Sequence, residues 1–386
     1  MNKAYRFRLF PNNEQTVLIR KTFGCVRFVY NRMLENRITI YELYKDDKEA
    51  LKKQKYAMPA DYKAENPWLK EVDSLALANA QLNLNVAYKN FFRDKSVGFP
   101  KFKSKHHDKK SYTTNNQKGT IRIINDRTIR LPKLKDVKIK LRRKIPENTI
   151  IKSATISEAA TGKYYISILV EYEEKIQLIT PKAEKVLGLD YSSKSLYIDS
   201  EGNSPDYPKF YRQAEKKLKK AQRKLSGRKK GGKNRKKQRM KVARLHEKVA
   251  NQRKDFLHKL SRQIANANDA VAIEDLNMRG MAQGLHLAKS TNDNGFGMLK
   301  TFLAYKLSEQ GKFLIVIDKW YPSSKTCHVC GEKNKALTLS DRVWGCKKCG
   351  TMLERDINAA INIKREGCRI LGIEEMKHIE PLDKWG

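Results

Sequence analysis

Four of the six cysteines in this 386-residue chain stand in two close pairs. Two residues separate Cys327 from Cys330, two separate Cys346 from Cys349, and fifteen residues lie between the pairs. This spacing is typical of a zinc ribbon, in which four thiolates surround one zinc ion. A glycine follows each pair directly, where a tight knuckle favours a residue that tolerates positive φ. The cysteines therefore predict a structural zinc site, with a redox-active dithiol as the alternative.

Three carboxylates form a second candidate site. Asp190 and Glu274 each follow a short apolar run, and Asp356 lies in the first turn of a predicted helix. Taken singly, each acid is weak evidence, because turns and helix caps often carry acids. If the two apolar runs are neighbouring strands, the three acids converge and can hold two divalent ions about 3.5 to 4 Å apart, as in phosphodiester hydrolysis. Oxygen ligands of this kind favour Mg²⁺ or Mn²⁺.

The charge of the chain points to a polyanionic partner. There are 81 Lys and Arg against 42 Asp and Glu, which gives a formal net charge of +39. Residues 209–254 alone contain 21 Lys and Arg and two Glu. Apolar residues spaced by three and four persist through this segment, so we expect a basic helical hairpin over 209–264 rather than a disordered tail. Such a charge suits nucleic acid.

Length and apolar periodicity predict an α+β chain of several domains. Between about residues 112 and 172 the short alternating runs suggest a small β unit, which we expect the N-terminal strand to join. Residues 98–105 form a basic aromatic loop. Apolar runs predict strands over 1–11, 120–124, 137–141, 164–170, 186–190, 270–273 and 312–317, and helical spacing predicts helices over 14–40 and 74–92.

A membrane location is not expected from the sequence. The longest apolar run, Phe313–Ile317, has five residues, far short of the ~20 that span a bilayer. The first thirteen residues mix charged with apolar residues, where a signal peptide would have an unbroken apolar core. We therefore expect a protein of the cytosol or nucleoid.

Several short motifs follow one another along the chain. They are both cysteine pairs and Tyr5–Pro11, Phe23–Arg32, Phe99–Lys105, Gly188-Leu189-Asp190, Ile273-Glu274-Asp275-Leu276-Asn277 and Arg355-Asp356-Ile357-Asn358-Ala359-Ala360. In this order they resemble the TnpB proteins of bacterial insertion sequences. The resemblance covers residues 1–365, and the order of the motifs is highly specific. Glu354 stands where many members carry another acid, which we regard as a minor departure.

The resemblance implies an RNA-guided DNA endonuclease related to type V CRISPR effectors. Members bind a guide RNA from the transposon end, recognise a short transposon-adjacent DNA motif and cut double-stranded DNA that matches the guide. The resemblance assigns Asp190, Glu274 and Asp356 to catalysis on Mg²⁺ or Mn²⁺, within a RuvC-like, ribonuclease-H-like fold. It implies structural zinc on the four cysteines. It leaves the oligomeric state unknown.

The resemblance also suggests the domain plan. We expect a β-rich, barrel-like, nucleic-acid-binding wedge domain over residues 1–12 with 112–180, and a helical recognition domain inserted over 13–111. A RuvC-like α/β nuclease domain should follow over 181–319 with 353–365, with the ribbon inserted over 320–352. Residues 366–386 should form a variable tail.

Candidate nucleic-acid contacts fall in three places. Gln81 and Asn85 lie one helical turn apart and could bridge N6 and N7 of adenine in the adjacent motif, although a polar solvent face is the alternative. The basic loop and the residues beyond it could approach the same duplex, and the hairpin suits phosphate contacts. These further candidates are Lys101, Phe102, Lys103, Thr113, Thr114, Arg228, Lys229, Lys230, Arg235, Lys236, Lys237 and Arg239.

Three other functions are compatible with these residues. Three acids and two metal ions also serve a transposase that joins DNA strands, although a ribbon just before the third acid argues against it. A guide-dependent DNA-binding regulator would not need cleavage, and a basic zinc-ribbon protein could simply bind RNA. The intact acids argue against both of these functions.

Overall fold

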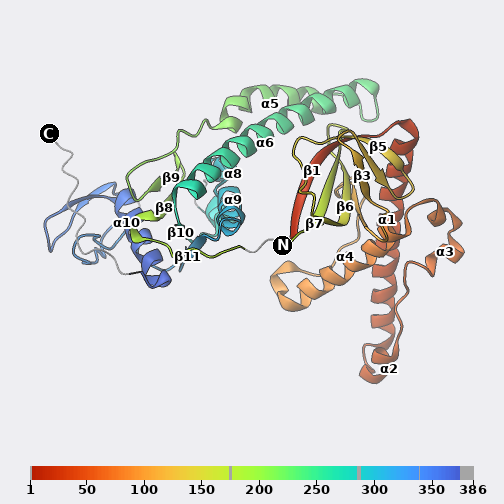
Figure 1. Ribbon diagram of the computed structural model, residues 1–386, viewed down its shortest axis with the longest axis horizontal. Coiled ribbons are helices and arrows are strands. Elements are labelled where there is room, and N and C mark those ends of the chain that lie inside the picture. The colour runs from red at the N-terminus through yellow and green to blue at the C-terminus, as the bar shows by residue number, and fades with distance from the viewer. Residues whose placement is uncertain (1, 174–175, 285–287, 339, 374–386) are drawn as a thin grey trace. The chain divides into compact units, whose positions relative to one another are not determined.

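The computed structural model describes residues 2–173, 176–284, 288–338 and 340–373, which fall into two compact units, 1–174 and 175–386 (Figure 1). Both units mix helices with strands, which confirms the predicted α+β class. Within these ranges, every helix is too short or too polar to cross a membrane.

Unit 1 contains a seven-stranded antiparallel sheet in the order β2-β6-β7-β1-β5-β4-β3. The predicted N-terminal strand does join the β unit, because β1 pairs with β7 on one side and β5 on the other. Apolar side chains alternate inward along these strands and form one face of the core. The strands are β1 (Asn2–Phe10), β2 (Ser111–Asn115), β3 (Arg122–Asn125), β4 (Thr128–Leu131), β5 (Lys135–Lys140), β6 (Ile150–Glu158) and β7 (Tyr164–Glu171).

Two long helices of unit 1 bury one face against this sheet. A capping box between Asn12 and Gln15 starts α1, which continues as a single helix of 32 residues. Buried residues of α1 and α4 share one core with the strands, as predicted from their spacing. The helices are α1 (Asn13–Tyr44), α2 (Lys48–Lys53), α3 (Tyr62–Glu65) and α4 (Ser74–Arg93), with 3₁₀ turns at Pro67–Glu71 and Lys95–Val97.

Unit 2 is built on a four-stranded sheet in the order β11-β10-β8-β9. The strands are β8 (Val186–Ser192), β9 (Leu196–Asp199), β10 (Ala270–Glu274) and β11 (Phe313–Ile317), preceded by a 3₁₀ turn at Ala183–Lys185. β10 pairs in parallel with both β8 and β11, so the two acid-bearing strands are neighbours. The expectation that β8 ends at Asp190 is wrong: the strand continues to Ser192 because Asp190 pairs with Ile198 of β9.

The basic segment forms the predicted helical hairpin, with α5 (Phe210–Ser226) and α6 (Lys233–Ala267) side by side (Figure 1). Unit 2 also contains α7 (Met278–Gly284), α8 (Ala288–Asn294), α9 (Phe296–Ser308) and α10 (Arg355–Leu371). Between β11 and α10, β12 (Val343–Gly345) pairs with β13 (Met352–Glu354).

Helix α10 lies directly on β8 and β10 because two glycines remove side chains from the contact. A Cβ atom at Gly188 would stand 2.1 Å from the carbonyl oxygen of Ala360. A Cβ atom at Gly367 would stand 2.6 Å from Cβ of Ala272. Both separations are far below van der Waals contact, so the close approach requires glycine at both positions. This packing fixes the helix that carries Asp356.

Candidate active site and cysteine cluster

The structure brings the three predicted carboxylates to one edge of the unit 2 sheet. Leu189 and Ile273 are paired in parallel register, so the acids that follow them, Asp190 and Glu274, occupy equivalent positions toward the carboxyl ends of the neighbouring strands β8 and β10. Asp356 lies in the first turn of α10. Burial raises the pKa of Asp190 well above its usual value, and the negative charges of Glu274 and then Asp356 raise it further. The register of β8 and β10 and the packing of α10 on β8 place the three carboxylates in one region of unit 2.

Glu274 is oriented by a serine that sequence reasoning missed. Burial raises the pKa of Glu274, and a hydrogen bond from the Ser323 hydroxyl to Oε1 partly offsets this effect. Ser323 is itself buried, and its carbonyl oxygen accepts bonds from the amides of Asn358 and Asn362 on α10. The serine lies far from Glu274 in the chain and carries no motif of its own, so only the fold connects the two.

Both carboxylate oxygens of Asp356 are paired with arginines. Arg355 donates from Nε and Nη2 to Oδ1 at 3.0 and 2.8 Å, and Arg342 donates from Nη1 to Oδ2 at 3.4 Å. Arg342 comes from the segment between the cysteine pairs, and its side chain is 68 % exposed against 13 % for Arg355. Arg342 is therefore the partner that can be displaced more easily.

The donor set fits divalent cations that prefer oxygen. Burial raises the pKa of both Asp190 and Glu274, and the charge of Glu274 raises that of Asp190 further, so a bound cation would stabilise the charged carboxylates. Among the described residues, the three carboxylates do not meet with all ligand atoms within 4.8 Å of one another, whereas the four cysteines do. For Asp356 to ligate the same ions, its pairing with Arg342 would have to open.

The four cysteines form a compact cluster. Sγ of Cys327 lies 3.7 Å from that of Cys349, and Sγ of Cys330 lies 3.5 Å from that of Cys346. In each knuckle the glycine after the pair has positive φ, 78° and 75°, and its N–H bonds the carbonyl of the first cysteine at 2.9 Å. The predicted knuckle conformation is thus confirmed. Four sulfur donors at this spacing fit a tetrahedral zinc ion.

The cysteine-bearing ribbon is fastened to α10 by polar side chains. Asn358 donates to carbonyl oxygens of the ribbon, including that of Thr326 at 2.8 Å, and Asn362 donates to the same oxygen at 2.6 Å. The backbone N–H of His328 donates to Oδ1 of Asn358 at 2.9 Å, and its Nδ1 lies 3.0 Å from that atom. Arg365 donates to the carbonyl oxygen of His328. His328 therefore serves the contact between ribbon and helix.

The basic hairpin presents most of its predicted cations to solvent. One exception is Arg235, whose Nη1 donates to the carbonyl oxygens of Leu225 at 2.7 Å and Arg228 at 2.8 Å, so it closes the end of α5. At the other end of α5, the buried Asp293 accepts from the N–H of Tyr211 at 2.9 Å. The remaining predicted cations are exposed: Arg228, Lys229, Lys230, Lys236, Lys237 and Arg239.

The two residues of α4 that are predicted to read the DNA motif differ in solvent exposure. Gln81 is half-buried, and Asn85 is exposed with its Oδ1 accepting from Nη2 of Arg37 at 2.5 Å. In the basic loop, Lys101 and Phe102 are exposed as expected.

Three predicted contacts of unit 1 have partners within the protein. Thr114 is 1 % exposed and donates its hydroxyl to Asp73, so it serves the core. Thr113 is half-buried, with its hydroxyl 2.8 Å from that of Thr155 across the sheet. Lys103 is half-buried, and its Nζ lies 3.9 Å from the centre of the Tyr30 ring, which anchors the loop on α1.

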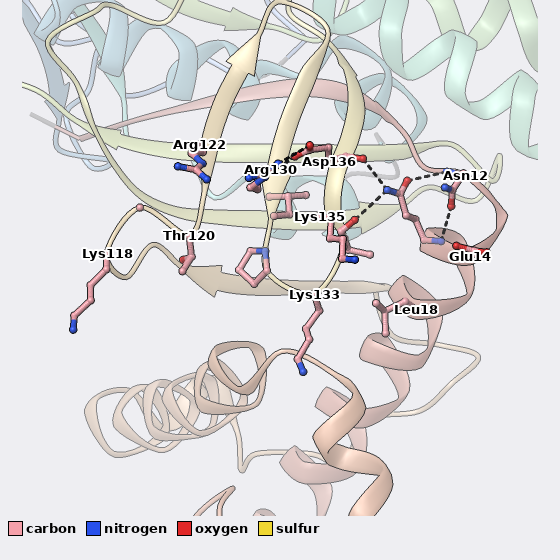
Figure 2. A pocket seen from close by; sticks show the side chains of 15 residues that line it. Asn12, Glu14, Leu18, Lys118, Thr120, Arg122, Arg130, Lys133, Lys135 and Asp136 are labelled. Carbon is pink, nitrogen blue, oxygen red and sulfur yellow. Dashed lines mark hydrogen bonds and ion pairs between the residues drawn. The ribbon is translucent and has the colours of Figure 1, made fainter.

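A cavity of about 1010 Å³ in unit 1 was not predicted (Figure 2). It lies between the start of α1 and the loops before β3 and β5, and five basic residues line it against two acids. Lys118, Lys133 and Lys135 all have left-handed φ values, of 50°, 63° and 55°. Arg130 pairs with Asp136 through two bonds of 2.6 and 2.7 Å. The cavity thus carries an excess of basic side chains.

Comparisons with known proteins match nearly all of the chain. Three family models fit successive segments: a "Helix-turn-helix domain" over residues 1–46, OrfB of IS605, described as "Probable transposase", over 167–284, and "Cas12f1-like, TNB domain" over 296–363. In this structure the first of these segments contains β1 and all of α1, a strand followed by one continuous helix.

Two full-length relatives and one solved structure extend these matches. A Streptomyces pristinaespiralis protein, "Putative RNA-guided DNA endonuclease", is 35 % identical over 371 residues, which cover 95 % of this chain and 90 % of the relative. An Escherichia coli K12 relative, "Putative RNA-guided DNA endonuclease InsQ", is 30 % identical over 390 residues, 97 % and 94 % of the two chains. The Cas12f1 chain of a "Cas12f1-sgRNA-target DNA complex" shares the fold, with a TM-score of 0.60 at 13 % identity over 94 % of this chain and 98 % of that one. The chain belongs to the TnpB family, the OrfB proteins of IS605-type insertion sequences.

Proposed function

We propose that this protein is an RNA-guided DNA endonuclease of a transposable element. It would cleave guide-matched double-stranded DNA next to a short transposon-adjacent motif, with a guide RNA from the transposon end. The observation that carries the proposal is the convergence of Asp190, Glu274 and Asp356 at one sheet edge in a strongly basic chain. The names of the full-length relatives support RNA guidance and a DNA substrate.

The three carboxylates would hold two Mg²⁺ or Mn²⁺ ions. Such ions activate water and stabilise the leaving oxygen in phosphodiester hydrolysis. Ser323 keeps one oxygen of Glu274 in a fixed direction. Release of Arg342 from Asp356 would free both a carboxylate oxygen and a guanidinium group beside the site. A guanidinium there is well suited to a DNA phosphate.

The other predicted sites would bind rather than react. One zinc ion on the four cysteines would stabilise the ribbon, which carries Arg342 to the carboxylates and is bonded to α10. The exposed hairpin cations would contact phosphates of the RNA and DNA without reading sequence. Gln81, with Asn85 one turn away, is the candidate reader of the adjacent DNA motif.

The decisive experiment compares Asp190→Ala with the parental protein, each loaded with guide RNA and Mg²⁺. Loss of a metal ligand should abolish cleavage of matched DNA. Guide-dependent DNA binding should persist or tighten slightly, because a negative charge leaves a site for an anion. Asp255→Ala is the matched control, since that exposed acid of the same unit forms an ion pair with Lys259 on the surface of α6. Cleavage by Asp190→Ala at nearly the parental rate would refute the active-site assignment.

The same preparations separate the alternative functions. Strand joining would appear as covalently linked DNA products, and a DNA-binding regulator would bind matched DNA without cutting it. Sequencing the RNA that copurifies tests guidance: one discrete species from a transposon end supports it, whereas heterogeneous RNA indicates a general RNA-binding protein.

A further inference from the structure

The loop after β11 holds an indole ring out in solvent. Trp320 is 79 % exposed, more than any other large apolar side chain in the described ranges. An indole ring offers a large flat apolar surface that proteins usually bury or use in recognition. Lys319 lies beside it, with its Nζ 5.0 Å from the centre of the ring. The exposed ring and the cation therefore form one local surface.

The exposure of Trp320 does not come from a loose loop. The N–H of Trp320 donates to Oδ1 of Asp318 at 2.7 Å, and the N–H of Tyr321 donates to the carbonyl oxygen of Asp318 at 3.1 Å. Tyr321 packs against the buried cluster that contains Ile317 and Ile363. The backbone is thus fixed on both sides of the ring, and binding a ligand there would require little ordering.

The loop after β11 contacts Glu274, one of the catalytic candidates, at both of its ends. Ile317, the last residue of β11, is paired in register with Glu274. Ser323, three residues beyond Trp320, donates its hydroxyl to the carboxylate of Glu274. Trp320 lies between these two contacts, at the sheet edge where the carboxylates converge.

We propose that Trp320 and Lys319 form a stacking subsite for one base of single-stranded DNA at the nuclease site. The base would stack on the indole, and its phosphate would lie near Nζ of Lys319. A single strand is required because a base within a duplex already has both faces covered by its neighbours. Stacking of this kind tolerates any base, as a guided enzyme needs. The proposal rests on the nuclease function above and adds to it a residue that positions the strand.

The test uses full-length protein carrying Asp190→Asn, so that DNA is bound but not cut. The probe is single-stranded DNA with 2-aminopurine at one position, moved along the strand in a series. Stacking on indole should quench the probe at one or two adjacent positions. Trp320→Ala should remove that quenching and weaken binding by roughly 5- to 150-fold, the range expected for one stacked base. Trp320→Phe should retain much of the affinity.

Phe92→Ala is the matched control, because Phe92 is 76 % exposed and lies in unit 1. It should leave the quenching at that position unchanged. Equal quenching and affinity in Trp320→Ala and its parent would overturn the subsite. The readout does not depend on cleavage, so failure of the nuclease proposal remains distinguishable: Asp190→Ala would then still cut DNA while the Trp320 signal behaved as expected.

Discussion

The cysteine cluster and the carboxylate site are both candidate metal centres, but the sequence separation between their residues differs greatly. All four cysteines lie between residues 327 and 349 and meet within 4.8 Å through two local knuckles. The carboxylates come from residues 190, 274 and 356 and meet only because β8, β10 and α10 pack together. The first centre is thus encoded by local spacing, and the second by the packing of the whole unit.

Of the changes that distinguish the two centres, removal of the cysteine cluster should have the largest effect on folding. Cys327→Ser with Cys346→Ser should release one zinc ion per chain, because two of the four thiolate ligands are removed. The ribbon should then unfold, and the bonds of Ser323 and Arg342 to the carboxylates should break with it, so cleavage should fall at least tenfold. Cys25→Ala with Cys368→Ala is the matched control and should keep the zinc. Full zinc retention by the first variant, measured by elemental analysis, would exclude the ribbon site.

The carboxylate site should instead be disrupted by a change in the packing of α10 on the sheet. Gly188→Ala would place Cβ 2.1 Å from a backbone oxygen of α10, so the helix must shift. We expect a loss of about 1 to 3 kcal/mol, a lower thermal midpoint and slower cleavage, with zinc content unchanged. Gly24→Ala is the control: a Cβ there meets nothing within 4 Å, and alanine in a helix should stabilise by up to about 1 kcal/mol. Equal midpoints for Gly188→Ala and its parent would contradict this packing.

Variants of the basic hairpin test phosphate binding separately from metal binding. Replacing Lys229, Lys230, Lys236 and Lys237 with Gln should weaken nucleic-acid binding and leave both metal centres intact. The logarithmic salt dependence should flatten by roughly 0.7 to 0.9 for each phosphate that is no longer neutralised by a lysine. Arg235→Gln should act differently, destabilising the hairpin because Arg235 bonds the end of α5. An unchanged salt slope in the lysine variant would mean that these cations only face solvent.

The smallest effect should appear in metal-free protein. The folded-state pKa of Asp190 is raised, so folded protein binds more protons than unfolded protein between the two pKa values, and stability falls as pH rises through that window. Asp190→Asn removes this titrating group and should raise the midpoint at neutral pH by about 2 to 4 °C, the shift that ~1 kcal/mol gives in a unit of this size. The difference should vanish at acidic pH. A lower midpoint for the variant at pH 7 would mean that the charge is compensated.

Much of the fold and the cysteine cluster could be predicted because their signals are local, whereas the three acids became candidates only through their setting at strand ends and a helix start and through the family resemblance. Strand alternation, helical spacing and the cysteine pairs need no knowledge of distant neighbours. The roles of Ser323 and Arg342 could not be predicted, because their partners lie on other elements. Asn358 and Asn362 did leave a signal: two amides at i and i+4 on the apolar face of α10 indicate buried hydrogen bonds. Thr114 was a candidate nucleic-acid contact but is buried, because the exposure of a side chain cannot be predicted from its residue type alone.

The position of α10 along the chain has a consequence for synthesis. Residues 355–371 are translated after β8 and β10, and they bring the third carboxylate and the helix to which the ribbon is bonded. Because domains fold as they emerge, the first two acids can be in place on the ribosome while the site is still incomplete. A chain that stops before this helix would keep most of its basic surface, yet would lack a finished nuclease centre. Nascent and prematurely terminated chains would therefore lack the third carboxylate of the candidate site.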